Sequence, residues 1–297
     1  MENIPKHRKL SFVIPSRDEG ETLKPLLEKL IELAPGAEIM VIDDGSKDDT
    51  PLTCSKFSIK FISHPYPKGN GAAIKTGARA ASGDVLVFMD ADGQHKPEDI
   101  PLLLEKFSEG YDMVVGARQS GSHAGIHRAA ANDVFSRFAT WMVQQPVADL
   151  TSGLRVVDAK KFRKFMYLLP NGFSYPTTIT MSFFRAGFNV GYVPIQTSRR
   201  ANGRSHIRPI RDGVRFLLII IKIGTLYSPQ KLFIPISAGF FLSGLLYYIY
   251  TYMTADRFTN MSALLFISAI LTFLVGIVSE QISALHYKGI DDARRNE

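Results

Sequence analysis

Two aspartates stand one residue apart where a strongly apolar run ends. The segment VLVFMDADGQHKPE spans residues 85–98, and its five apolar residues predict a buried strand that leads into Asp90 and Asp92. If the chain stays extended, the two carboxylates project from one face, because side chains alternate along a strand. Paired oxygens suit a hard cation, Mg²⁺ or Mn²⁺, and Gln94 can add a neutral oxygen. Taken alone, the pair is better explained by a capped turn.

Polar clusters also follow two other predicted strands. Residues 16–19 come after the run 10–15, and residues 43–46 come after the run 38–43. Short β-branched runs alternate with helical patterns over residues 9–196, which predicts an α/β fold with a mainly parallel sheet. Ligands bind at the carboxyl ends of the strands in such sheets, so we expect all three clusters at one edge.

The same alternation predicts where the elements begin and end. The expected strands are 10–15, 38–43, 59–63, 85–89 and 113–116. One helix is expected from about residue 21 to residue 33, and another from the Gly-rich segment 68–77 through residue 81.

Composition narrows the class of protein. The chain has 297 residues, of which 45% are hydrophobic, so it can bury a full-sized core. Its net charge of +7 favours an anionic partner: nucleic acid, a lipid phosphate or a phosphorylated substrate. Cys54 is the only cysteine, so an intrachain disulfide is excluded. Residues 1–11 contain no apolar run, and we therefore expect no cleaved secretory signal and a catalytic part in the cytosol.

Two long apolar runs occupy the C-terminal third. Residues 232–253 carry no formal charge over 22 positions, and residues 261–278 form a second run of 18. Each run is long enough to span a bilayer, which favours a transmembrane hairpin over a buried helical hairpin. Gly239 and Ser243 form a small-xxx-small pair through which such spans can pack into a homo-oligomer.

Flanking cations predict the orientation of this hairpin. Lysines and arginines precede the first run and follow the second, whereas the connecting loop carries only Arg257. The positive-inside rule therefore places both chain ends in the cytosol. Residues 208–230 are expected to form an interfacial helix, with a helix packed on the soluble domain as the alternative. The expected divisions are a catalytic domain at 1–207, the juxtamembrane helix at 208–230, the hairpin at 231–285 and a cytosolic tail at 286–297.

The polar motifs occur in an order that resembles a known family. They read P-S-R-D-E at 15–19, D-D-G-S-K-D-D-T at 43–50, G-N-G-A-A-I-K-T-G at 69–77, D-A-D-G-Q-H-K-P-E at 90–98, V-G-A-R at 115–118, D-L-T-S-G-L-R at 149–155 and R-A-N-G-R-S-H at 200–206. The series resembles the inverting family 2 glycosyltransferases. Within them it is similar to the polyprenyl-phosphate branch, which includes dolichol-phosphate mannose synthases and undecaprenyl-phosphate sugar transferases. The resemblance covers roughly residues 10–210.

The resemblance implies a GT-A fold, a UDP- or GDP-linked sugar donor and a polyprenyl-phosphate acceptor. It assigns the nucleotide to Pro15, Ser16, Arg17, Glu19, Asp43, Asn70, Asp90 and Ala91. It assigns the metal to Asp90, Asp92 and Gln94, and catalysis to Asp92, Arg118 and Arg200. It assigns the lipid phosphate and the acceptor side to Arg128, Asn132, Asp149, Ser152, Arg155, Ser205 and His206. The loop 200–206 is expected to close over the phosphates.

The chemistry of such a transfer suits these residue types. Breaking a sugar–diphosphate bond builds negative charge that a divalent cation and arginines stabilise. A lipid phosphate is already an anionic nucleophile, so a dedicated base is dispensable. Two alternatives stay open: a family 2 enzyme that uses a glycolipid hydroxyl with Asp149 as its base, and a membrane scaffold that binds nucleotide sugars without catalysis. Nucleic-acid binding is disfavoured, because the cations gather near the membrane without interleaved aromatics.

Overall fold

The computed structural model describes residues 8–118, 136–172, 175–197, 221–222 and 224–295. The chain divides into two compact units. One comprises Met1–Trp141 and Gln145–Ile207, and the other comprises Met142–Gln144 and Arg208–Glu297. Each unit is described separately below.

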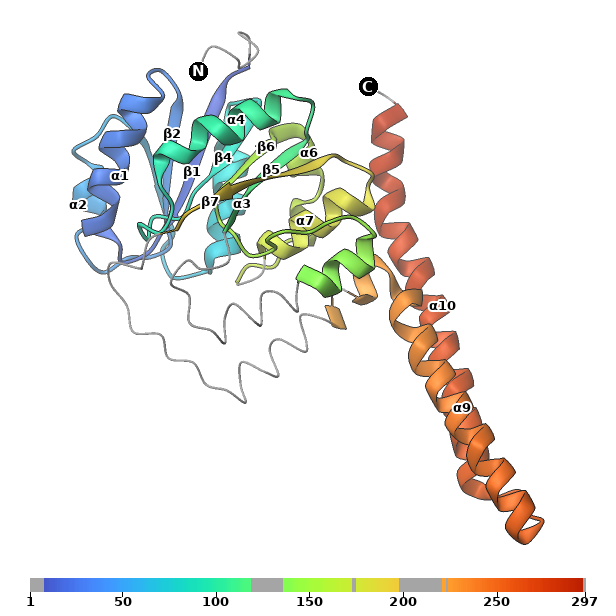
Figure 1. The fold of residues 1–297 in the computed structure, drawn as a ribbon. Coiled ribbons are helices and arrows are strands. Elements are labelled where there is room, and N and C mark those ends of the chain that lie inside the picture. The colour runs from blue at the N-terminus through green and yellow to red at the C-terminus, as the bar shows by residue number, and fades with distance from the viewer. Residues whose placement is uncertain (1–7, 119–135, 173–174, 198–220, 223, 296–297) are drawn as a thin grey trace. The chain divides into compact units, whose positions relative to one another are not determined.

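A seven-stranded mixed sheet forms the centre of the first unit (Figure 1). Its strands, in chain order, are β1 (Leu10–Ser16), β2 (Glu38–Asp43), β3 (Lys60–Ser63), β4 (Val85–Phe88), β5 (Met113–Arg118), β6 (Arg155–Asp158) and β7 (Val190–Ile195). The spatial order is β3-β2-β1-β4-β6-β5-β7. All neighbouring pairs are parallel except those of β6, which runs antiparallel to both β4 and β5.

The structure confirms the α/β class and the mainly parallel sheet. The five expected strands are all present, and their ends differ from the expected ones by no more than two residues. Strands β6 and β7 were not among the expected elements. Strand β6 has only four residues, RVVD, and two of them are charged, so it carries too little apolar pattern to be recognised alone.

Helices cover both faces of the sheet. They are α1 (Gly20–Leu33), α2 (Thr50–Cys54), α3 (Asn70–Ala80), α4 (Ile100–Ser108), α6 (Ala159–Lys164) and α7 (Tyr175–Arg185), with short 3₁₀ turns η1 (Pro97–Asp99) and η2 (Met166–Leu168). Leu23 of α1 and Leu103 of α4 join the buried cluster that contains Phe12. Helix α3 lies on the other face, where Gly77 abuts Val13. Because side chains alternate along β1, the neighbouring residues Phe12 and Val13 pack against the helices on opposite faces of the sheet.

The strand register brings separate polar segments to one edge of the sheet. Ser16 at the end of β1 is aligned with Asp43 at the end of β2. Strand β6 begins at Arg155, which pairs with Phe88 at the end of β4. Because β6 is antiparallel, its start lies at the carboxyl ends of its neighbours. The segment 149–154 that precedes it therefore lies at the same edge as the segment that follows β4.

The second unit contains two long helices that lie side by side, α9 (Pro229–Ala255) and α10 (Asn260–Arg295) (Figure 1). Gly244 packs against Leu265, and Gly276 packs against Phe233, so the two helices run antiparallel. Their apolar windows have mean hydropathies of 1.8 and 2.5, yet only 6% and 17% of those windows is buried. Helices that expose so much apolar surface suit a bilayer better than a soluble core. Most of the expected interfacial helix at 208–230 lies outside the described residues.

Candidate active site

The loops that follow β1 and β2 are tied together by hydrogen bonds. The backbone N–H of Asp18 donates to Ser46 Oγ (2.9 Å), and that of Lys47 donates to Asp18 Oδ1 (2.7 Å). The N–H of Gly20, at the start of α1, donates to Asp48 Oδ2 (2.9 Å). A carboxylate at a helix N-terminus satisfies a free donor and complements the helix dipole. Residues 16–20 and 43–50 therefore form one wall of the sheet edge.

Asp43 and Ser16 lie next to each other in this wall. Asp43 is 1% exposed; its Oδ2 accepts from Ser63 Oγ (2.7 Å), and its Oδ1 accepts from Ser46 N–H (3.0 Å). Each carboxylate oxygen has a second lone pair, so Asp43 can still accept from a ligand. Pro15 lies beside them in β1, Glu19 is half-buried, and Arg17 and Asn70 are exposed.

The Gly-rich segment at the start of α3 is docked on the backbone of residues 170–172. Ala72 N–H donates to Asn171 O (2.9 Å), and Gly71 N–H donates to Gly172 O (3.3 Å). A Cβ on Gly71 would stand 2.1 Å from Pro170 O. These N–H groups thus donate to other parts of the protein. Glycine at position 71 allows the backbone of α3 to approach the backbone of residues 170–172 closely. The sequence pattern located this helix start but did not show its contact, which spans about a hundred residues.

Because of this contact, we expect replacement of Gly71 by alanine to destabilise the protein, although a glycine-to-alanine change within a helix usually stabilises it. Gly71→Ala should lower the free energy of unfolding by about 1–3 kcal/mol, because the methyl group overlaps a backbone oxygen. Helix propensity alone would predict a gain of about 0.5–1 kcal/mol. Urea unfolding of the full chain in detergent measures the difference. Gly172→Ala is the matched control, since a Cβ there meets nothing within 4 Å; equal stability of the two variants would contradict the contact.

A buried carboxylate–imidazole pair, absent from the residues inferred from sequence, holds the turn before α3. Asp44 Oδ1 lies 2.8 Å from His64 Nδ1, and Asp44 also accepts from the N–H groups of Lys68 (2.8 Å) and Gly69 (2.7 Å). Burial raises the pKa of Asp44, but the hydrogen bonds from His64, Lys68 and Gly69 outweigh it and lower that pKa. The other ring nitrogen, His64 Nε2, lies 3.0 Å from Thr76 Oγ1. Asp44 directly follows Asp43, but the local sequence pattern does not indicate that its side chain is buried and paired with His64.

After β4 the chain bends at residues 91–93, so Asp90 precedes the bend and Asp92 lies within it. The strand ends at Phe88, and the chain turns at Gly93, where φ is +72°, so the extended continuation expected for Asp90 and Asp92 is not what the structure shows. Asp92 Oδ1 accepts from Gln94 N–H (3.1 Å). The carbonyl of the buried Ala91 accepts from Thr22 Oγ1 of α1 (2.7 Å). Both carboxylates are half-buried, at the edge where the polar segments converge.

The donor set fits a hard divalent cation. Two carboxylates and the amide of Gln94 offer oxygen ligands of the type that Mg²⁺ and Mn²⁺ prefer. Over the described ranges, no three His, Cys, Asp or Glu side chains come together as a metal cluster. If a cation binds here, these side chains would supply only part of its coordination shell, and water and substrate phosphates would complete it, as is usual for Mg²⁺.

Three buried polar atoms near this edge have no hydrogen-bond partner among the described residues. They are Ser16 Oγ after β1, His95 Nδ1 after β4 and Ser152 Oγ before β6. Burial lowers the pKa of His95 despite the opposing influence of Asp90 and Asp92, which favours a neutral imidazole. Buried polar groups are normally satisfied by protein, water or ligand, so three of them at one edge support a ligand site there.

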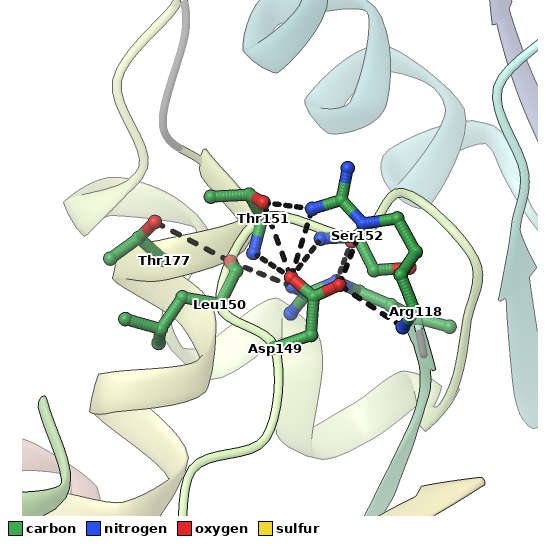
Figure 2. Close-up of polar contacts among 7 residues, drawn as sticks. Arg118, Asp149, Leu150, Thr151, Ser152 and Thr177 are labelled. Atoms are coloured by element: carbon green, nitrogen blue, oxygen red, sulfur yellow. Dashed lines mark hydrogen bonds and ion pairs between the residues drawn. The ribbon is translucent and has the colours of Figure 1, made fainter. Parts of the chain in front are cut away.

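Arg118, at the end of β5, forms a bidentate ion pair with Asp149. Figure 2 shows the two side chains joined, with Nε 2.8 Å from Oδ2 and Nη2 3.0 Å from Oδ1. Asp149 Oδ1 also accepts from the N–H groups of Thr151 (2.9 Å) and Ser152 (3.2 Å), and Arg118 Nη2 donates to Thr151 Oγ1. Bidentate charge-assisted pairs fix geometry as well as charge.

The pair sets the charge states of both groups. Burial raises the pKa of Asp149, but hydrogen bonding to Arg118 and its charge lower that pKa further than burial raises it. Burial lowers the pKa of Arg118, and Asp149 more than compensates, so the net pKa of Arg118 is raised. A buried carboxylate with a lowered pKa and fully engaged oxygens is poorly suited to accept a proton. The geometry therefore argues against Asp149 as the base of a hydroxyl-acceptor reaction.

Arg155, at the start of β6, is buried, and its guanidinium donates hydrogen bonds to backbone carbonyl oxygens inside the protein. Its side chain donates to Ser152 O (2.8 Å), Leu150 O (3.1 Å) and Pro176 O (2.9 Å). Leu150 O also accepts from Thr177 Oγ1 (3.4 Å), as Figure 2 shows. With only 1% of its surface exposed, Arg155 holds the segment 149–155 in shape rather than presenting its charge to solvent.

The remaining residues assigned from sequence lie outside the described residues and stay predictions. They are Arg128, Asn132, Arg200, Ser205 and His206. The structure does bring together Asp90, Asp92, Arg118, Asp149 and Ser152, which come from three separate segments.

Comparison with known proteins identifies the family. Residues 11–166, more than half of the chain, match the sequence model of glycosyl transferase family 2. The chain belongs to this family. Residues 228–285 match a second model, described as the GtrB C-terminal hairpin, which covers helix α9 and the apolar part of α10, Asn260–Leu285. The chain is therefore a family 2 glycosyltransferase with an apolar C-terminal hairpin.

Several curated proteins are similar to parts of this glycosyltransferase. A dolichol-phosphate mannosyltransferase of Pyrococcus furiosus is 40% identical over 116 residues, which is 37% of this chain and 33% of that protein. A dolichyl-phosphate hexose transferase of Haloferax volcanii is 27% identical over 72% of this chain and 93% of that protein. An undecaprenyl-phosphate 4-deoxy-4-formamido-L-arabinose transferase of Klebsiella pneumoniae is 33% identical over 52% of this chain and 50% of that protein.

Solved structures confirm the GT-A fold expected from the motifs. The glucosyl-3-phosphoglycerate synthase of Mycobacterium tuberculosis, in complex with Mn²⁺, UDP and its product, superposes with a TM-score of 0.58. The alignment covers 73% of this chain and 78% of the synthase, at 20% identity. At that identity the likeness shows a shared fold, and the Mn²⁺ and UDP belong to the synthase.

Proposed function

We propose that this glycosyltransferase transfers a hexose-type sugar from a UDP- or GDP-linked donor to polyprenyl phosphate. The observation that carries the proposal is the union, in one chain, of a family 2 catalytic unit with a GtrB-type hairpin. Relatives named for transfer to dolichol or undecaprenyl phosphate support the lipid acceptor. The argument against Asp149 as a base favours an acceptor that is already ionised over a hydroxyl acceptor.

The reaction is a single displacement with inversion. An anionic oxygen of the lipid phosphate attacks the anomeric carbon from the side opposite the diphosphate. The new carbon–oxygen bond forms while the bond to the diphosphate breaks, and its electron pair leaves with the nucleoside diphosphate. No proton has to move, so the protein mainly has to orient two anions and stabilise the leaving group.

Asp90, Asp92 and Gln94 would hold Mg²⁺ or Mn²⁺ against the donor diphosphate. When bound, the cation supplies positive charge to the phosphate oxygens. The wall formed by residues 16–20 and 43–50 receives the nucleoside, with Asp43 and Ser16 offering polar contacts. These assignments rest on the carboxylates and the buried unpartnered atoms at one sheet edge.

Arg118 supplies a second, preorganised positive charge. Its Nε and Nη2 are held by Asp149 and Thr151, whereas its Nη1 donates to no residue that the structure describes. The side chain is 31% exposed, so this nitrogen can reach a phosphate. Anchoring one side of a guanidinium in this way reduces the reorganisation needed when charge develops.

The hairpin of α9 and α10 anchors the enzyme to the membrane. We further propose that the catalytic unit and both chain ends lie in the cytosol, a proposal that the flanking cations support through the positive-inside rule. A Cβ on Gly239 would meet no atom of the described residues within 4 Å, which supports this part of α9 as a contact surface for a second copy of the chain. Cysteine labelling from either side of the membrane would test the orientation, and crosslinking in the bilayer would test self-association.

A donor and acceptor screen tests the proposed function. The full chain, in detergent or vesicles, is expected to move label from a UDP- or GDP-linked sugar into an organic-extractable product only when polyprenyl phosphate is added. The product should release its sugar in mild acid, as glycosyl phosphates do, and should have the anomeric configuration opposite to that of the donor. Transfer to a glycolipid hydroxyl would overturn the acceptor assignment. Nucleotide binding without transfer to any acceptor would favour a scaffold.

A further inference from the structure

Gly153 lies directly against the carboxylate of Asp90. A Cβ placed on Gly153 would stand 1.9 Å from Asp90 Oδ2, 2.6 Å from Asp90 Cγ and 3.0 Å from Asp90 Oδ1. Real side-chain contacts do not approach so closely, so only a residue without a side chain fits here while Asp90 keeps its position. Asp90, which is assigned to the metal, and the segment before β6 are thus in direct contact.

The backbone conformation of Gly153 does not explain why glycine stands there. Its φ lies outside the positive range that favours glycine, unlike the φ of Gly69 (+104°) and of Gly93 (+72°). The space taken by Asp90 is therefore the reason for glycine at this position.

The backbone on either side of Gly153 is fixed by hydrogen bonds. Ser152 N–H donates to Asp149 Oδ1 (3.2 Å), and Ser152 O accepts from Arg155 Nε (2.8 Å). Leu154 O accepts from Gly116 N–H of β5 (3.0 Å). Asp90 follows the end of β4, and its carboxylate is carried by a side chain with two rotatable bonds. An added methyl group at position 153 should therefore displace the carboxylate and leave the backbone in place.

We propose that Gly153 is a positioning residue that sets the orientation of the Asp90 carboxylate toward a divalent cation. The inference rests on the proposed function only in that Asp90 holds the cation. The same segment carries Asp149, which anchors Arg118, so residues 149–155 set the cation and the arginine relative to each other. One short segment then places both positive charges that face the donor diphosphate.

Gly153→Ala in the full chain tests the proposal by metal affinity. Binding of Mn²⁺ in the presence of UDP or GDP is measured by the loss of the free-ion signal in electron paramagnetic resonance. The dissociation constant for Mn²⁺ is expected to rise roughly 10- to 100-fold, the range seen when a group that orients a metal ligand is changed. Gly172→Ala, which adds a methyl group that meets no described atom within 4 Å, should leave Mn²⁺ affinity unchanged.

Asp90→Asn separates failure of this inference from failure of the function. If Asp90→Asn weakens Mn²⁺ binding but Gly153→Ala does not, the positioning role is wrong and the cation site stands. If neither variant weakens it, Asp90 does not hold the cation, and both the site assignment and the inference fail.

A double variant keeps the proposal testable if Gly153→Ala destabilises the fold. In an Asp90→Ala background the carboxylate is gone, so adding Gly153→Ala should cause no further loss of thermal stability. An equal loss in both backgrounds would show that the methyl group clashes elsewhere, which would overturn the proposal.

Discussion

Asp92→Ala is expected to lower the rate of sugar transfer by roughly 10²- to 10³-fold, the usual cost of removing one group that stabilises developing charge in an active site. Asp92 is half-buried on the bend after β4, at the sheet edge, where its Oδ1 accepts a hydrogen bond from Gln94 N–H (3.1 Å). Its loss should therefore affect the bound cation far more than the fold. Initial rates at saturating donor and acceptor measure the effect.

Two controls make this result specific to the metal site. Glu105→Ala removes an exposed carboxylate on the surface of α4 and should leave the rate within twofold of the parent. An excess of chelator should abolish transfer by the parent protein, and added Mg²⁺ or Mn²⁺ should restore it. Full activity of the parent in chelator, or of Asp92→Ala without it, would contradict the assignment of a catalytic cation.

The second large effect is expected for the ion pair of Arg118 and Asp149. Asp149→Asn should lower the free energy of unfolding by about 3–5 kcal/mol, because it leaves a mostly buried cation without its counter-charge. The same change should also reduce transfer, since Arg118 loses the carboxylate that orients it. Urea unfolding of the full chain in detergent measures the first effect, and initial rates measure the second.

An exposed ion pair provides the matched control. Lys106 and Glu109 pair on the surface near the end of α4, where both side chains remain accessible. Glu109→Gln should change stability by no more than about 1 kcal/mol, as is typical of surface pairs. Equal effects of Glu109→Gln and Asp149→Asn would mean that the pair of Arg118 and Asp149 contributes little to the fold.

Acid should remove the stabilisation that Asp149 provides. The folded-state pKa of Asp149 is lowered, so its contribution is complete above the unfolded-state pKa of about 3.9 and is lost as pH falls from there through the folded-state pKa. Asp44 and Asp48 also have lowered pKa values and share this acid sensitivity. The difference between the parent and Asp149→Asn therefore isolates the contribution of Asp149, and it should shrink below about pH 4.

Local patterns in the sequence determined the parallel part of the sheet, the edge that carries the polar residues and the apolar hairpin. Each depends on a short stretch: an apolar run such as 85–89, a polar residue such as Asp43 at its end, or 22 uncharged residues at 232–253. The hydrophobic effect acts on these stretches in much the same way in any context, so their pattern is sufficient.

Only the tertiary structure decided how the site is assembled. The reversal of β6, with four residues and little apolar pattern, brings the segment 149–154 beside the end of β4. Arg118 and Asp149 are 31 residues apart in the sequence. The ion pair between them occupies the carboxylate of Asp149, which is therefore poorly suited to act as a base. The roles of Gly71 and Gly153 likewise depend on a carbonyl and a carboxylate from distant segments. Such contacts follow from the packing of the whole sheet, because no local propensity encodes which distant atom will occupy the space beside a glycine.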